Sequence, residues 1–392
     1  MIDRRILTHF DFLLPILILP IIGTSYFLIA QINTTQNLKQ AVYIIVGIIA
    51  FLCAFFIPFR RLNKSIPLFY WICIILLILV ELIGTKQLGA QRWITIGSFS
   101  IQPSEPIKIA IILLLSAHIQ ANPPPLHGYG LRQFCILSFY ILLPFTLILL
   151  QPDLGTALVV LFMGFGTLFL IGVNYKIWVG ILIGILIASP LIYGSLKDYQ
   201  RKRIHDFVSE KPSYHVQQSI ITISSGGLIG KNKENATQTQ LRFLPIATSD
   251  FIFAYFSERF GFVGILILLT IYCLLTLHIL TFSMLDPKDY YLKTTACAIS
   301  LLLFFYVSVN IAMTINLAPV VGIPLPLFSY GGSSFITFMI LFGILENLLA
   351  FRFNFGYNQS FFRKVKIGRR KISGGGAEPI RIFKNFSYLI FL

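Results

Sequence analysis

Residues 250–282 read DFIFAYFSERFGFVGILILLTIYCLLTLHILTF, and the only Asp, Glu, Lys or Arg side chains after Asp250 are Glu258 and Arg259. The remainder, 260–282, is long enough to cross the roughly 30 Å hydrocarbon core of a bilayer as a helix. The stretch therefore predicts a membrane-spanning helix with a carboxylate just outside it.

The whole chain has a composition close to that of this stretch. Its 392 residues are 56% hydrophobic and 12% charged, with a mean hydropathy of +0.81, which excludes an ordinary soluble domain. We expect an all-α integral membrane protein of about ten transmembrane helices, since spans take about 17 to 25 apolar residues. The predicted spans are 11–31, 41–59, 67–84, 105–120, 134–150, 155–173, 177–194, 260–282, 294–316 and 333–351.

An even number of spans puts both termini on one side of the membrane. Short loops on that side carry nine Lys and Arg residues against three on the other, so both termini are expected in the cytoplasm. The large loop 195–259, between the seventh and eighth spans, is then external. We divide the chain into a polytopic membrane domain, 1–351, and a basic cytoplasmic tail, 352–392, which is expected to bind anionic lipid headgroups and not nucleic acid.

Asp250 is the main catalytic candidate. It ends the polar external loop and precedes the apolar residues 251–254. Apolar surroundings raise a carboxyl pKa and nearby cations lower it, and in either case the group is a candidate general base for a substrate hydroxyl within hydrogen-bond reach. The N-cap of the following helix is an equally good interpretation.

Glu105 and Lys108 stand three residues apart at the start of a predicted helix, so they share one face. Pro106 suits the first turn and Ser104 suits the N-cap. Two interpretations stand: an internal structural ion pair, or a polar cavity open to the outside in which Lys108 binds a phosphate.

Two further segments carry polar or irregular sequence at membrane depth. Asp153, in the external turn 151–156, is expected to cap the helix that begins near Gly155. Segment 320–334 holds two prolines and three glycines, which prevent a regular helix, and irregular backbone at that depth must line a cavity or be buried in protein.

Common cofactor signatures are missing from the sequence. The six histidines show no zinc-site spacing, and neither a Walker A motif nor a dinucleotide-binding glycine fingerprint occurs. All five cysteines fall inside predicted spans, so an external disulfide framework is not expected. We expect no metal site from these motifs.

Several motifs together resemble the SEDS family of bacterial cell-wall polymerases, named for shape, elongation, division and sporulation. The similarity extends over the membrane region and is greatest to the elongation branch, on residues 196–204 and 237–245. The matching segments are Gly89 to Trp93, Gln102 to Glu105 with Lys108, Gln151 to Thr156, Gly322 to Pro326 and Ser329 to Ser334.

The resemblance implies a glycosyltransferase of the bacterial inner membrane that polymerises lipid II on its periplasmic face, with Asp250 as the catalytic residue. It also implies a class B penicillin-binding protein, a transpeptidase, as partner. Arg92, Lys108 and the cluster Arg201, Lys202 and Arg203 would offset the charge of the leaving undecaprenyl pyrophosphate. A divalent cation, Mg²⁺ or Mn²⁺, is an open alternative for that task, but the sequence does not establish one. Further substrate-binding candidates are Glu105, Gln218, Gln240, Ser329, Gly331 and Gly332, and structural or cavity candidates are Gln102, Ser104, Asp153 and Glu258.

The chain departs from the family pattern beside Asp250. Where the family reads Leu-Pro-Glu and then His-Thr-Asp, residues 244–250 read Leu-Pro-Ile-Ala-Thr-Ser-Asp, so a carboxylate and a histidine are missing next to the proposed base. A lipid II flippase or a non-catalytic scaffold stands as the alternative function. Polymerisation is favoured because the polar groups cluster on the external side.

Overall fold

The structure, a computed structural model, describes residues 9–87, 90–96, 99–194, 201, 213–236, 238 and 248–352. Two compact units divide the chain: Asp11–Leu348, and residues 1–10 together with 349–392. Only residues 9–10 and 349–352 of the second unit are described, so the basic tail predicted for 352–392 lies outside the described residues apart from Arg352. The site belongs to the first unit.

The predicted all-α membrane fold is confirmed, because each of the ten predicted spans coincides with one apolar helix. Seven of these helices are long and apolar enough to cross a membrane, and α4, α5 and α8 contain shorter apolar stretches. The chain is a multi-pass membrane protein. The helices are α2 (Leu13–Ile32), α3 (Thr34–Phe56), α4 (Ile66–Ile83), α5 (Pro106–Ala121), α6 (Leu131–Leu150), α7 (Leu154–Ile171), α8 (Tyr175–Gly194), α12 (Ile252–Thr281), α13 (Tyr290–Thr314) and α14 (Gly332–Ala350).

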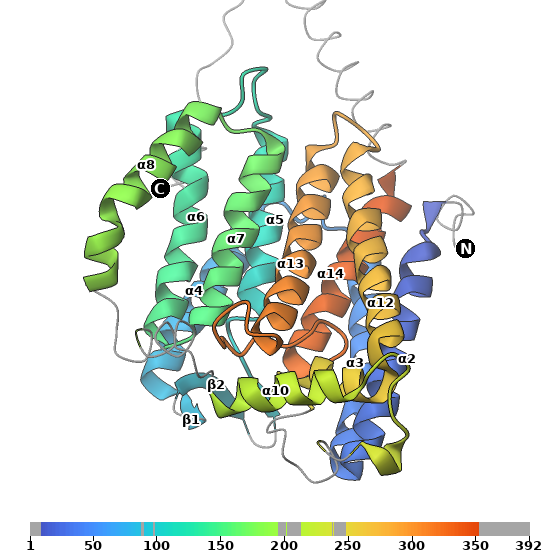
Figure 1. Cartoon of the computed structure of the whole chain (residues 1–392). Coiled ribbons are helices and arrows are strands. Elements are labelled where there is room, and N and C mark those ends of the chain that lie inside the picture. The colour runs from blue at the N-terminus through green and yellow to red at the C-terminus, as the bar shows by residue number, and fades with distance from the viewer. Residues whose placement is uncertain are drawn as a thin grey trace, which may run out of the picture. The chain divides into compact units, whose positions relative to one another are not determined.

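Helix α13 is the central element of the packing. It contacts α5, α7 and α12 (Figure 1), and it buries side chains from Tyr291 to Thr314. A helix that is buried on most of its faces has few positions where a polar side chain meets water. Polar residues on α13 therefore have to find partners inside the protein or line a cavity.

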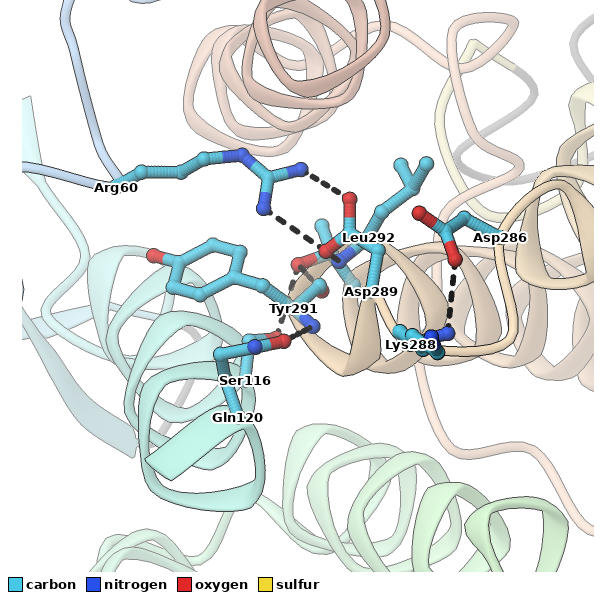
Figure 2. A network of polar contacts seen from close by, with 9 residues as sticks. Arg60, Ser116, Gln120, Asp286, Lys288, Asp289, Tyr291 and Leu292 are labelled. Atoms are coloured by element: carbon cyan, nitrogen blue, oxygen red, sulfur yellow. Dashed lines mark hydrogen bonds and ion pairs between the residues drawn. The ribbon is translucent and has the colours of Figure 1, made fainter. Parts of the chain in front are cut away.

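A polar network holds the N-terminal end of α13, as Figure 2 shows. Arg60, in the loop after α3, donates to both carboxylate oxygens of Asp289. Asp289 in turn caps α13 by accepting from the Leu292 amide at 3.1 Å. Gln120 of α5 accepts from the Tyr291 amide at 2.8 Å. These contacts fix the N-terminal end of α13 against α5 and the α3–α4 loop, and so fix the position of α13 along its axis.

Two structured segments were not predicted as such. Three short strands, β1 (Thr85–Gln87), β2 (Ala90–Ile96) and β3 (Phe99–Ile101), form an antiparallel sheet in the order β1-β2-β3. The predicted external loop contains α10 (Tyr214–Ser225) and a 3-10 turn, η1 (Lys233–Asn235), while η2 (Phe282–Met284) follows α12. Helix α10 contacts α12 and α13 and runs across them instead of along them (Figure 1).

Helix α12 begins eight residues before the predicted span and is broken at Gly261, where φ is 62° and ψ is −165°. The turn after α10, residues 226–231, fills this break. The Phe262 amide donates to Gly227 O at 2.9 Å, the Val263 amide to Leu228 O at 3.1 Å, and the Lys231 amide to Glu258 O at 2.9 Å. Backbone groups freed by the break are thus paired within the protein, as buried backbone requires.

Candidate active site

A cavity of about 330 Å³ opens where the broken segments of the chain meet. It is formed by β2, by the residues just before α5 and α12, by the turn into α7, by α13, and by the segment between α13 and α14 with the first turn of α14. Its lining comprises Arg92, Trp93, Gln102, Glu105, Asp153, Thr156, Ser249, Asp250, Tyr306, Gly322, Ile323, Pro324, Leu325, Leu327, Ser329, Tyr330, Gly331, Ser333, Ser334 and Phe335.

The segment between α13 and α14 has the irregular backbone that its prolines and glycines predict. Gly322 has a φ of +70° and Leu327 one of +60°. Two side chains from other helices hold its carbonyl groups: Ser25 of α2 donates to Phe328 O at 2.5 Å, and Tyr272 of α12 donates to Pro326 O at 2.6 Å. The segment was expected either to line a cavity or to be buried in protein, and it does both, because it lines the cavity and several of its side chains are buried.

Asp250 lies in the cavity wall and its main chain is fixed from two sides. Asn310 of α13 donates through one amide nitrogen to Asp250 O at 3.0 Å and to Ile323 O at 2.7 Å. Ser329 donates its hydroxyl to Ser249 O at 2.7 Å, and the Tyr330 amide donates to Thr248 O at 2.8 Å. The carboxylate is therefore held at a defined place beside the irregular segment.

The surroundings of the Asp250 side chain suit a general base. Burial raises the pKa of the Asp250 carboxyl above its ordinary value, and a hydrogen bond from the Ser249 side chain opposes part of this rise. The carboxylate does not serve as a helix cap, because α12 begins after Phe251 without a side-chain cap bond. Of the two interpretations of Asp250, the structure thus removes the N-cap.

Arg92 and Asp153 form a second group in the same cavity. An Arg92 guanidinium nitrogen lies 3.6 Å from Asp153 Oδ1, and the guanidinium also donates to the carbonyl oxygens of Gln151 and Pro152. Asp153 accepts from the Thr156 amide at 3.2 Å and so caps α7, as predicted. Gln102 donates to the other Asp153 oxygen at 3.4 Å. The pair places a cation in the wall of the cavity that also contains Asp250.

Glu105 and Lys108 form the ion pair that their spacing predicts, with 2.8 Å between Lys108 Nζ and Glu105 Oε1. Lys108 is completely buried and also bonds the Tyr306 hydroxyl. Glu105 and Tyr306 line the cavity, whereas Lys108 does not. The second oxygen of Glu105, Oε2, is buried without a hydrogen-bond partner. Lys108 therefore does not face the cavity itself, but it holds two side chains that do, Glu105 and Tyr306.

The N-cap predicted for Ser104 is wrong. The N-cap residue of α5 is Glu105, without a side-chain cap bond, and Ser104 Oγ is buried without a partner. The reason is the turn that precedes the helix: the Glu105 amide donates to Gln102 O at 3.0 Å, so the backbone already turns before the first helical residue.

Several other candidates lie away from the cavity lining or outside the described residues. Gln218 is on α10 and partly exposed, and Gly332 packs against the Tyr43 ring. Glu258 is buried and accepts from the Gln238 amide at 3.1 Å. Arg201 donates to Gly194 O. Lys202, Arg203 and Gln240 lie outside the described residues, as do Ile246 and Ala247 of the altered segment.

Tyr306 and Asn310 were not among the predicted site residues. The signal that would have found them is a polar stripe at four-residue spacing, 306, 310 and 314, on an otherwise apolar helix. Within the described residues, no group of three or more His, Cys, Asp or Glu is placed to hold a metal ion.

Comparison with known proteins agrees with this architecture. The family model for FtsW, RodA and SpoVE, described as "Cell cycle protein", matches residues 5–353. A Helicobacter pylori relative named peptidoglycan glycosyltransferase MrdB is 59% identical over 359 residues, covering 91% of this chain and 94% of the relative.

Two solved structures share the fold. One is described as the structural coordination of polymerization and crosslinking by a peptidoglycan synthase complex; it is 28% identical, has a TM-score of 0.77, and the match covers 88% of this chain and 98% of that one. The other is the rod shape determining protein RodA of Thermus thermophilus, 26% identical with a TM-score of 0.67, covering 88% and 97%. The resemblance found in the sequence is confirmed: this chain belongs to the FtsW, RodA and SpoVE family.

Proposed function

We propose that this chain is a peptidoglycan glycosyltransferase that polymerises lipid II, with Asp250 as its general base. The observation that carries the proposal is the position of Asp250: a carboxylate with a raised pKa, held by its main chain in a cavity that also contains Arg92. The names of the relatives support the reaction class, and the geometry supports the assignment of the base.

In the proposed reaction, Asp250 takes the proton from the 4-hydroxyl of the acceptor sugar. The hydroxyl oxygen attacks the anomeric carbon of the donor sugar, and the bond from that carbon to the pyrophosphate oxygen breaks. The bonding electrons leave with undecaprenyl pyrophosphate. A general base of this kind contributes about 10² to 10⁴ in rate.

Arg92 is the described cation best placed for the leaving group, because its guanidinium lines the cavity. Fixed positive charge near developing negative charge lowers the barrier. Lys108 has a different part: its charge is buried against Glu105, so it positions Glu105 and Tyr306 and does not contact pyrophosphate. The cluster at 201–203 remains a candidate for the approach of the anionic substrate.

The proposal places this chemistry on the external face of the bacterial inner membrane, following the charge asymmetry of the short loops. A class B penicillin-binding protein is the proposed partner. The solved peptidoglycan synthase complex that this chain resembles joins polymerization to crosslinking, which supports a transpeptidase in that role.

The test uses purified full-length protein with its transpeptidase and labelled lipid II, read out as glycan polymer on a gel. Asp250→Asn is expected to lower the initial rate about 100-fold or more. The matched control is Asp286→Asn, which should retain the wild-type rate. It makes the same change at an exposed carboxylate just before the N-terminal end of α13, away from the cavity. Equal rates for Asp250→Asn and wild type would exclude Asp250 as the base, and the absence of polymer from wild type would favour the flippase or scaffold.

A further inference from the structure

The turn after α10 exposes apolar side chains at its tip. Leu228 is 72% exposed and Ile229 is 84% exposed. Large apolar side chains that project together from a polar segment usually mark a contact surface. This surface is separate from the cavity, and nothing in the proposed chemistry uses it.

The tip has a fixed position relative to the membrane-spanning part of α12. Two glycines of the turn allow close backbone contact: a Cβ on Gly226 would lie 2.1 Å from Ser257 O, and one on Gly230 would lie 2.3 Å from Arg259 O. Together with the bonds from the Phe262 and Val263 amides, these contacts prevent the turn from moving away from α12 without breaking the helix junction.

The tip continues the surface that α12 presents to lipid. The residues paired with it, Phe262 and Val263, are exposed, and so are Leu266 and Ile267 one turn further along. All four lie in the membrane-spanning stretch Ile252–Met284. The tip thus stands at the height where the lipid-facing side of α12 begins.

The sequence becomes polar and charged directly after the tip. The sequence continues from Gly230 as Lys-Asn-Lys-Glu-Asn, residues 231–235. Lysines next to an apolar insertion can extend to the headgroups while the apolar residues contact the acyl chains.

We propose that Leu228 and Ile229 insert into the boundary between headgroups and acyl chains, in the leaflet on the Asp250 side of the membrane. The occupant of this surface is lipid, because the tip is continuous with the lipid-facing side of α12. The insertion anchors α10 to the membrane. It also holds the break at Gly261, and with it the short helical stretch that follows Asp250.

The test measures contact with lipid directly. Ile229→Trp and Asn235→Trp are made in the full chain, whose three natural tryptophans supply the background recorded from wild type. Each protein is reconstituted into phosphatidylcholine vesicles with and without acyl chains brominated near the headgroup. The added fluorescence at 229 should fall about twofold with brominated lipid, while that at Asn235, an exposed polar position in the same loop, should not change.

Leu228→Trp repeats the measurement at the neighbouring tip residue and should give the same loss. Absence of quenching at both tip positions would overturn the proposal, and so would equal quenching at Asn235. The measurement is repeated with the transpeptidase bound: if quenching at 229 is then lost, the tip is covered by protein, and lipid is the wrong occupant. The readout does not depend on polymerisation, so failure of this proposal is separable from failure of the proposed function.

Discussion

Replacing Asn310 with leucine should disable the site while leaving every titratable side chain in place. The Asn310 amide nitrogen is the shared donor to Asp250 O and Ile323 O, and Asn310 is fully buried. Leucine has a similar volume and no donor, so both carbonyl oxygens lose this partner. A buried group left unsatisfied costs about 1 to 3 kcal/mol. Two oxygens lose their donor, but leucine also removes the Asn310 Oδ1 atom, which is buried without a partner, so the net cost is that of about one group, about 1 to 3 kcal/mol.

Part of that cost should be relieved by movement of Asp250 away from the segment at Ile323. A displacement of about 1 Å in a reacting group can lower a rate by about 100-fold. We therefore expect Asn310→Leu to lower kcat for glycan polymerisation by at least about tenfold, with a smaller change in KM, because the substrate-contacting side chains remain.

The control is Asn347→Leu. Asn347 is also a buried asparagine, and its amide nitrogen donates to Phe55 O at 2.6 Å, a carbonyl that does not line the cavity. Both variants should have a lower Tm in detergent, but only Asn310→Leu should lose kcat in lipid II polymerisation. If the two variants lose stability to a similar degree and both retain the wild-type kcat, Asn310 does not position Asp250.

Three further outcomes follow from the same contacts. Burial raises the pKa of Asp250 in the folded protein, so the free energy of unfolding of wild type falls as pH rises from the unfolded-state pKa of about 3.9 through the folded-state pKa. Asp250→Asn should therefore have a higher Tm than wild type at pH 7, and this difference should disappear below about pH 3.9. An equal Tm at all pH values would contradict this. Gly226→Ala would place a Cβ 2.1 Å from Ser257 O, so we expect a clear fall in Tm, and an unchanged Tm would show that the turn does not pack against α12. Tyr306→Phe removes the hydroxyl bonded to Lys108 and should lower kcat severalfold without preventing folding, whereas an unchanged kcat and pH profile would leave that hydroxyl no part in the site.

Local sequence patterns were sufficient for much of this structure. Apolar length predicted the helices, and the three-residue spacing of Glu105 and Lys108 predicted their ion pair. The position of Asp153 before α7 predicted a cap. In each case the interacting groups lie within a few residues of one another, so the backbone geometry of a helix or a turn decides the contact.

The remaining features depend on contacts between distant segments. Lys108 is turned into the protein by Tyr306 of α13, a partner that its own helix does not reveal. The early start of α12 needs the turn at 226–231 to pair the groups freed at Gly261. No spacing rule within 250–282 predicts the pairing of this turn with α12, because the local sequence shows only a glycine beside an apolar run.

The two ion pairs beside Asp250 have a consequence for the charge of the cavity during turnover. Arg92 with Asp153 and Lys108 with Glu105 are each neutral as pairs, which leaves the Asp250 carboxylate unbalanced among these five groups. Under the proposed chemistry, the incoming proton neutralises Asp250 as the pyrophosphate gains one unit of negative charge. Negative charge is then relocated and not accumulated, so the walls need not reorganise between the bound substrate and the departing product.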